Sequence, residues 1–187
     1  SCSSHLNYID EHLKLISKNR SHIRQVILSN HWYLGLTGQI RQTSTKSLYG
    51  SQRLVSKSPL IPQGSNVDMM VDSVSTLIDQ LEAWKLPVLI VRSTPDMEDD
   101  PQVVCSNKTD CTVPKSSFSR ERKLEDMLIE RLLEKHPHVA VVDPFNSLCE
   151  GDQCFFVRNG QSLYRDGDHL SSIGSDLVGL EIIKSIT

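Results

Sequence analysis

The sequence alternates amphipathic helical segments with short apolar runs, and this alternation restricts its fold more than any other feature. Apolar residues recur at helical spacing in three segments, residues 6–16, 67–84 and 119–135. Each segment is followed by a short run rich in β-branched residues, at 26–28, 88–91 and 139–142. Strands that alternate with helices pair in parallel, because each helix carries the chain back across the sheet. We therefore expect an α/β fold of three layers, α/β/α, with a mostly parallel sheet.

The segments between these elements carry turn and loop signals. Residues 35–64 and 93–115 are rich in polar residues, Gly and Pro without a sustained period, so we expect two long loops. Ser65 or Asn66 is expected to cap the second helix. Residues 149–164 predict an irregular hairpin with its turn at Asn159-Gly160, and a last helix should run from residue 171 or 172 to 186.

Length and charge exclude several classes of protein. A chain of 187 residues fits one globular domain, and we expect a single domain over residues 1–187. The net charge is −3 with both signs interspersed, so the basic stripe that nucleic acid binding requires is absent from the sequence. The longest apolar run lies around residues 88–91 and is far shorter than the ~20 residues that span a bilayer.

The five cysteines indicate an oxidising compartment. Cys105 and Cys111 bracket one short segment, Cys149 and Cys154 bracket another, and neither gap has the spacing of a zinc ribbon. We expect the disulfides Cys105–Cys111 and Cys149–Cys154, the alternative being unpaired buried thiols. Cys2 is then left over, either as a free thiol or with a partner upstream of this sequence.

The segment Tyr164 to Ser171, with the sequence YRDGDHLS, carries the strongest catalytic signal. It sets a carboxylate and an imidazole three residues apart, at Asp166 and His169, just before the last helix. A nucleophilic hydroxyl needs a general base, and that base needs a third group that fixes its tautomer. We interpret Asp166 and His169 as the Asp-His half of such a site. The alternative is a turn-forming aspartate beside an ordinary loop histidine.

At this point the sequence resembles the SGNH hydrolase superfamily, whose last conserved block is a D-x-x-H that supplies the triad's Asp and His. The segments LYRDGDHLSSIGSDLV, VVDPFNSLCEGDQC and VILSNHW resemble more narrowly the SGNH domains fused to bacterial membrane O-acyltransferases of the acyltransferase-three type. The resemblance implies an SGNH/flavodoxin-like fold and acyl transfer, above all acetylation, to polysaccharides of the cell envelope. It implies an acyl donor and a carbohydrate acceptor as partners, a membrane acyltransferase domain in the same polypeptide, and a periplasmic location. This chemistry requires no metal and no organic cofactor.

The chain departs from that family in its nucleophile. The family places its serine in a G-D-S motif after the first strand, and no G-D-S occurs here, since Gly151-Asp152 is followed by Gln153. Matching the tryptophan segment to the family places residue 1 after the nucleophile. We therefore expect the first strand and its serine to lie outside this segment. Within the chain, Ser65 is better explained as a helix cap, and Ser4 has no preceding strand that could form a nucleophile elbow.

Two residues after the first expected strand are candidate ligand contacts. SGNH members often use an asparagine there as an oxyanion donor, a role that Asn30 could fill, the alternative being a strand-end turn. Trp32 could stack on a sugar ring or could pack against the core. The histidines His31, His136 and His138 form no convincing metal constellation in the sequence and are expected at the surface or beside strands.

Three hypotheses follow for the function. The first is an extracytoplasmic O-acyltransferase domain that works through an acyl-serine intermediate. The second is a free-standing esterase of the same superfamily, in which water accepts the acyl group. The third is a glycan-binding or partner-binding module without catalysis.

Overall fold

The computed structural model describes residues 2–30, 32, 36, 65–97 and 100–186, with the backbone alone for residues 2–10. The long loop expected at 35–64 thus lies outside the described residues, apart from Leu36. No helix in the described part has the length and apolar character that crossing a membrane requires.

The centre of the fold is a parallel sheet with the strand order β1-β2-β4. Its strands are β1 (Val26–Ser29), β2 (Val88–Val91) and β4 (Ala140–Val142). Leu89 of β2 is in register with both Ile27 of β1 and Ala140 of β4. All four residues of β2 are buried, as expected for a central strand that is covered on both faces. The predicted parallel α/β fold is confirmed.

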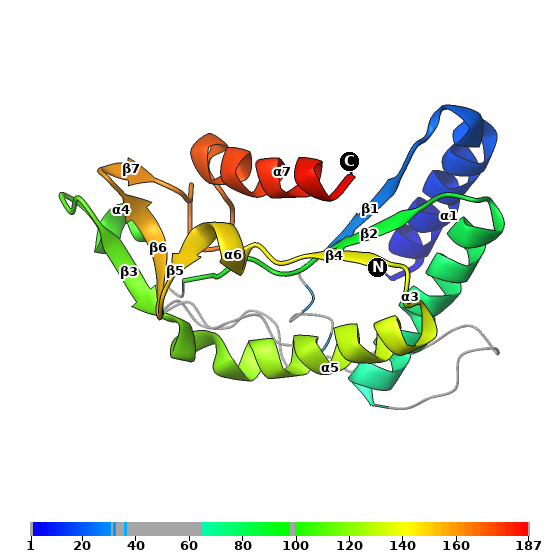
Figure 1. Cartoon of the computed structure of the whole chain (residues 1–187), viewed down its shortest axis with the longest axis horizontal. Coiled ribbons are helices and arrows are strands. Elements are labelled where there is room, and N and C mark those ends of the chain that lie inside the picture. Colours follow the sequence, from blue (N-terminus) through cyan, green and yellow to red (C-terminus); the bar gives the residue numbers. More distant parts are fainter. Residues whose placement is uncertain (1, 31, 33–35, 37–64, 98–99, 187) are drawn as a thin grey trace.

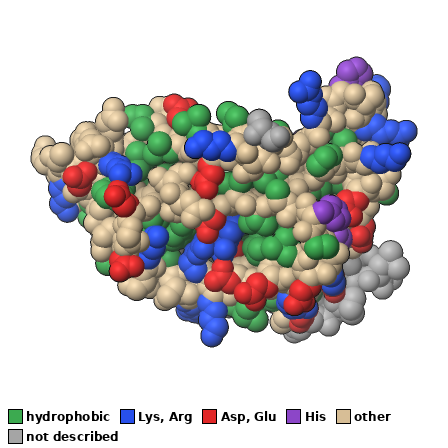
Figure 2. Space-filling view, viewed as in Figure 1, with side chains coloured by type: hydrophobic (Ala, Val, Ile, Leu, Met, Phe, Trp, Pro, Cys, Tyr) green, Lys and Arg blue, Asp and Glu red, His purple; other side chains and the backbone are tan. Residues whose placement is uncertain are grey.

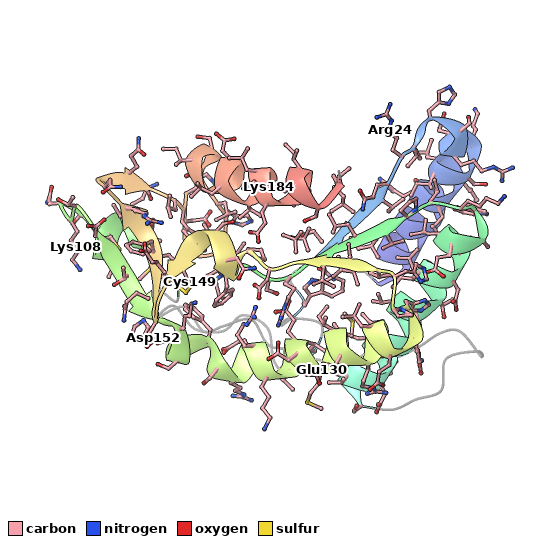
Figure 3. All side chains as sticks on the ribbon, viewed as in Figure 1. Arg24, Lys108, Glu130, Cys149, Asp152 and Lys184 are labelled. Atoms are coloured by element: carbon pink, nitrogen blue, oxygen red, sulfur yellow. A yellow bond between two sulfur atoms is a disulfide. The ribbon has the colours of Figure 1, made fainter. Side chains whose placement is uncertain are left out.

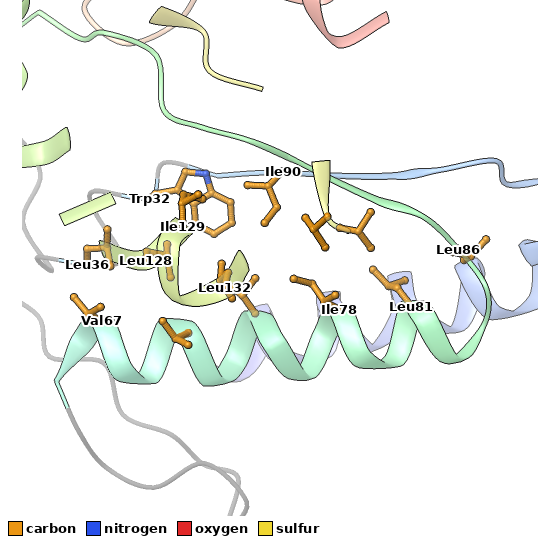
Figure 4. Close-up of a cluster of buried hydrophobic side chains, with 14 residues drawn as sticks. Trp32, Leu36, Val67, Ile78, Leu81, Leu86, Ile90, Leu128, Ile129 and Leu132 are labelled. Carbon is orange, nitrogen blue, oxygen red and sulfur yellow. The ribbon is translucent and has the colours of Figure 1, made fainter. Parts of the chain in front are cut away.

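Helices cover both faces of this sheet (Figure 1). One layer is formed by α3 (Asn66–Ala83) and α5 (Ser119–Lys135), and the opposite layer by α7 (Ser172–Ile186). The larger core lies between the sheet and the first layer, where Ile78, Ile90 and Leu128 are each 0% exposed (Figure 4). A smaller core packs Ile182 of α7 against Leu89 on the other face.

Helix α3 begins with the cap that the sequence predicts. The Ser65 side chain accepts a hydrogen bond from the Asp68 backbone N–H, and the Asp68 carboxylate accepts one from the Ser65 backbone N–H. This reciprocal capping box satisfies two N–H groups that would otherwise lack partners. Asp68 also receives a hydrogen bond of 2.7 Å from Arg131 of α5, which joins the two helices of this layer.

A second, antiparallel sheet lies at the other end of the molecule. Its strands are β3 (Cys111–Pro114), β5 (Cys149–Glu150), β6 (Gln153–Arg158) and β7 (Gln161–Ser162). The turn at Asn159 and Gly160 has φ of 52° and 75°, the positive values that a tight hairpin turn of this type requires. The hairpin prediction is therefore confirmed. The prediction of a continuous loop at 93–115 is wrong at β3, which pairs with β6.

The four cysteines of this region form the two disulfides that the sequence predicts, Cys105–Cys111 and Cys149–Cys154. The second disulfide joins directly paired positions of β5 and β6, close to the labelled Cys149 in Figure 3. All four half-cystines belong to one buried cluster with Phe156. The disulfides therefore fasten the small sheet and the short helix beside it.

The other helical elements are short, apart from the first. They are α1 (Cys2–Asn19), η1 (Arg20–His22), α4 (Pro101–Val104), η2 (Lys115–Phe118) and α6 (Phe145–Leu148). Helix α1 is longer at both ends than the segment 6–16 that periodicity predicts.

Candidate active site

A cleft opens at the carboxyl ends of β1 and β2, where parallel α/β sheets place their ligands. Its wall on the sheet side includes Asn30 and Ser93, which follow β1 and β2. Its opposite wall includes Val178 and Gly179 of α7. His169 lines the same cleft. The fold thus brings the predicted catalytic histidine and the predicted oxyanion donor to one cavity, although they are far apart in the sequence.

The loop that carries His169 closes on itself. Tyr164 and Leu170 form an antiparallel bridge, and the Arg165 backbone N–H donates to the His169 carbonyl at 2.8 Å. The Asp166 carboxylate accepts hydrogen bonds from the backbone N–H groups of Asp168 and His169, at 3.2 and 2.8 Å. An aspartate that bonds the backbone two and three residues on is a common turn former. Asp166 therefore shapes the turn in which His169 stands.

The segment that follows β2 is hydrogen-bonded to the turn that carries His169. The Tyr164 hydroxyl donates to the Pro95 carbonyl at 2.6 Å, and Tyr164 is 0% exposed. The Met97 backbone N–H donates to the Gly167 carbonyl at 2.8 Å. Burial and the nearby Asp96 carboxylate raise the pKa of Tyr164 far above its usual range, so its hydroxyl remains a donor. These bonds tie the His169 turn to the segment that follows β2.

The His169 ring is oriented by carboxylates. Its Nδ1 lies 2.9 Å from Asp166 Oδ1 and 3.0 Å from Asp168 Oδ1. An ionised carboxylate only accepts hydrogen bonds, so Nδ1 carries the proton. In a neutral ring Nε2 then keeps its lone pair, which is the tautomer that a general base needs. Among the described residues, no side chain hydrogen-bonds to Nε2.

The Asp166 carboxyl is held in its ionised form. Desolvation raises its pKa, but hydrogen bonds from the backbone and ring of His169 and from Asp168 lower it by more. The net pKa of Asp166 lies well below its usual range. At neutral pH it can therefore accept the Nδ1 proton bond and stabilise an imidazolium at His169.

A network of charged side chains holds the segment that follows β2, whose Arg92 and Ser93 line the cleft. Glu125 of α5 is 3% exposed and accepts hydrogen bonds from the Ser93 backbone N–H at 2.7 Å and from Arg92 at 3.3 Å. Arg92 also pairs with Asp126, and Arg122 forms a bidentate pair with Asp143 at the end of β4. Desolvation lowers the pKa of Arg92, but the neighbouring carboxylates raise it by more, so it stays charged. Glu125 thereby fixes the backbone that follows β2.

The two candidate ligand contacts, Asn30 and Trp32, differ in their exposure to solvent. Asn30 is exposed at the cleft. Trp32 is 3% exposed and its indole N–H donates to the Val91 carbonyl at 2.8 Å, so it packs between sheet and helices (Figure 4). This arrangement favours the packing role over sugar stacking, because both faces of the ring are within the core. His31 lies outside the described residues.

Sequence reasoning missed several residues of this region. The sequence gives no signal that Asp168 contacts the His169 ring, yet its Oδ1 lies 3.0 Å from Nδ1. Glu125 gives no local signal beyond an acidic residue at an apolar position of α5. His136 lies between α5 and β4, so it flanks a strand as expected, but it is 4% exposed rather than at the surface, and its Nε2 lies 2.8 Å from Ser75 Oγ. The donor atoms of Asp166, Asp168 and His169 lie within 4.8 Å of one another, so this group also has the spacing of a cation site.

Comparison with known proteins gives one family. The family model described as "SGNH domain (fused to AT3 domains)" matches residues 1–184. Searches of curated proteins and of solved structures found no match to the chain.

Proposed function

Because the chain belongs to the family of SGNH domains that are fused to AT3 domains, we propose that it catalyses O-acyl transfer through Asp166 and His169. Membership of the family implies a hydrolase-like or acyltransferase-like function. The finer proposal is acetyl transfer to a hydroxyl of a cell-envelope polysaccharide. The observation that carries it is the His169 ring, fixed by carboxylates at Nδ1 and lining a cleft at the carboxyl ends of the strands.

The proposed reaction has two steps. A serine Oγ attacks the carbonyl carbon of the acyl donor while His169 Nε2 takes the serine proton. The tetrahedral intermediate then collapses, the donor's leaving group takes that proton, and an acyl-serine remains. In the second step a sugar hydroxyl attacks the acyl-serine carbonyl while His169 takes the hydroxyl proton. The bond between the acyl group and serine Oγ then breaks, the acyl group stays on the sugar oxygen, and the proton returns to serine. The Asn30 amide donates a hydrogen bond to the oxyanion in both steps.

We propose that the serine comes from outside residues 1–187. The sequence contains no G-D-S. Of the serines that line the cleft, Ser93 has its Oγ buried without a hydrogen-bond partner. Ser29 and Ser175 line the cleft as well, and neither makes a hydrogen bond to His169 within the described part of the chain. A nucleophile poised for attack needs its base within hydrogen-bond reach.

The surroundings of the domain are part of the proposal. The family description supports a membrane AT3 domain in the same polypeptide. Disulfides persist in oxidising compartments, so the two cystines support a location on the extracytoplasmic, periplasmic side of the membrane.

The test is an acyl transfer assay on the full-length gene product with p-nitrophenyl acetate, in the presence and absence of an envelope glycan. We expect acetyl-glycan to form, with a loss of about 10³-fold or more in His169→Ala. The exposed His22 provides a matched control, and His22→Ala should retain the rate. Acetate release without transfer would support the esterase hypothesis. Glycan binding without turnover would support the non-catalytic module, and unchanged transfer in His169→Ala would refute the assignment.

A further inference from the structure

A second cluster of histidine and carboxylate side chains lies at the opposite end of the parallel sheet from the cleft. It joins the end of α3 to the turn between α5 and β4. Asp79 and Glu82 are three residues apart on α3, which places them on one face of that helix. His136 follows the last residue of α5, and His138 comes two residues later. Figure 2 shows purple and red side chains gathered on the surface over this end of α5.

The donor atoms of Asp79, Glu82 and His136 lie within 4.8 Å of one another, and His138 contacts Glu82 beside them. His136 Nδ1 lies 3.5 Å from Glu82 Oε1 and 3.9 Å from Asp79 Oδ1. His138 Nε2 lies 2.7 Å from the same Glu82 oxygen. Four ligands arranged as a tetrahedron at zinc distances of 2.0–2.1 Å would be roughly 3.3–3.4 Å apart. The two separations from His136 are therefore close to ligand spacing and longer than the usual hydrogen bond of about 2.9–3.0 Å.

One buried carboxylate oxygen in the cluster lacks a hydrogen bond. Glu82 Oε1 is buried and has no hydrogen-bond partner, although His138 Nε2 approaches it closely. The His136 side chain is only 5% exposed, and its Nδ1 makes no hydrogen bond within the described residues while it faces two carboxylates. A buried acceptor without a partner is costly, and a cation shared with His136 Nδ1 would satisfy the Glu82 oxygen.

A hydrogen bond to the second ring nitrogen, Nε2, fixes the orientation of the His136 ring. Its Nε2 lies 2.8 Å from the hydroxyl of Ser75, and both residues are buried. When Nε2 carries the proton and donates to Ser75, the Nδ1 lone pair points toward the carboxylates. Metal-binding histidines are usually oriented by such a hydrogen bond on the other ring nitrogen.

We propose that Asp79, Glu82, His136 and His138 form a structural site for a divalent transition metal, with Zn²⁺ as the fitting ion. Two imidazoles and two carboxylates are a donor set that Zn²⁺ accepts, and four protein ligands complete a tetrahedron. His138 is 65% exposed and can move outward from its short contact to a ligand position. The metal would fasten the end of α3 to the start of β4.

The test is a titration of Zn²⁺ into the protein, purified without a histidine tag, followed by calorimetry. Absorption of bound Co²⁺ reports the coordination geometry. We expect one Zn²⁺ bound per protein molecule at this site, an absorption spectrum typical of tetrahedral Co²⁺, and a higher Tm with metal than without it. The exposed ligands give variants that keep the fold, Asp79→Asn and His138→Ala, checked by circular dichroism. Each should weaken binding by more than the ~10–100-fold that loss of an outer-shell partner costs, and Ser75→Ala should fall within that range.

The controls separate this site from other histidines of the chain. His22→Ala and His169→Ala should bind Zn²⁺ with unchanged affinity at this site. The proposal is overturned if the protein binds no stoichiometric Zn²⁺, if Asp79→Asn and His138→Ala bind as tightly as the wild type, or if only His169→Ala abolishes binding. This last result would place the ion at the Asp166-Asp168-His169 group instead.

Discussion

The carbonyl oxygen of Leu163 lies so close to Gly174 that a β-carbon on Gly174 would stand 2.1 Å from it. Gly174 is in the first turn of α7, and Leu163 immediately precedes the bridge that closes the His169 loop. The hydroxyl of Ser171 donates to the Ser162 carbonyl at the same junction. This close approach of helix and backbone sets the position of α7, and therefore the width of the cleft.

Gly174→Ala is expected to destabilise the protein by about 2–3 kcal/mol, because the backbone must move to admit the methyl group. Gly179 supplies the matched control, since a β-carbon there meets nothing within 4 Å. Gly179→Ala should stabilise α7 by about 0.5–1 kcal/mol, the usual difference between these residues in a helix. Urea unfolding of both variants measures the two effects. Equal effects of the two substitutions would contradict the close approach.

Glu125→Gln is expected to lower the free energy of unfolding by about 3 kcal/mol, because it removes one partner from a buried charge network. The change preserves side-chain volume, so the loss reflects charge and hydrogen bonding to Arg92 and Ser93. Glu130, labelled on the same helix in Figure 3, is exposed, and Glu130→Gln should change stability by less than about 0.5 kcal/mol. Chemical denaturation provides the measurement. A Glu125→Gln variant as stable as Glu130→Gln would show that the bonds from Glu125 to Arg92 and Ser93 do not stabilise the fold.

The cap of α3 should make stability depend on pH in the acid range. The Ser65 hydroxyl, followed by Arg131, lowers the pKa of Asp68 to about 2. An aspartate of the unfolded chain titrates near 3.9, so the folded state binds fewer protons between these values. The stabilisation is therefore fully present above pH of about 4 and is lost as pH falls toward 2.

Asp68→Asn should remove this component of the pH dependence, and Ser65→Ala should reduce it, because Ser65 contributes the largest shift. The measurement is the free energy of unfolding at a series of pH values between about 2 and 5. Parallel curves for the wild type and Asp68→Asn over that range would be inconsistent with the cap as described.

Sequence patterns predicted the features that depend on residues close together in the chain. Helix α5 occupies residues 119–135 as its apolar period indicates, and Ser65 caps α3 because capping involves residues three apart. The pair Asp166 and His169 was predictable for the same reason, since one turn contains both. Strand β3 was not, because four residues ending in Pro114 become a strand only through pairing with β6. Tertiary pairing overrides a weak local preference of this kind.

The contacts of Glu125 and His136 could not be predicted, because each joins segments that are distant in the sequence. Glu125 meets the backbone of Ser93 across 32 residues, and His136 meets Ser75 across 61. No local spacing encodes either contact, because each depends on how α5 packs against the sheet and α3. Trp32 shows the same limit, since a tryptophan after a strand is compatible with both packing and ligand stacking until its burial is known.

In the proposed mechanism Asp166, rather than Asp168, orients His169 for acyl transfer, although both carboxylates lie near Nδ1. Asp166 bonds the ring and the backbone of the turn together, whereas Asp168 is more exposed. The most direct test is kcat/KM for acyl transfer by the full-length protein carrying Asp166→Asn or Asp168→Asn. We expect a loss of about 10³–10⁴-fold in Asp166→Asn, as for the orienting aspartate of a triad, and less than about tenfold in Asp168→Asn. An equal or larger loss in Asp168→Asn, or near-normal transfer by Asp166→Asn, would contradict the account.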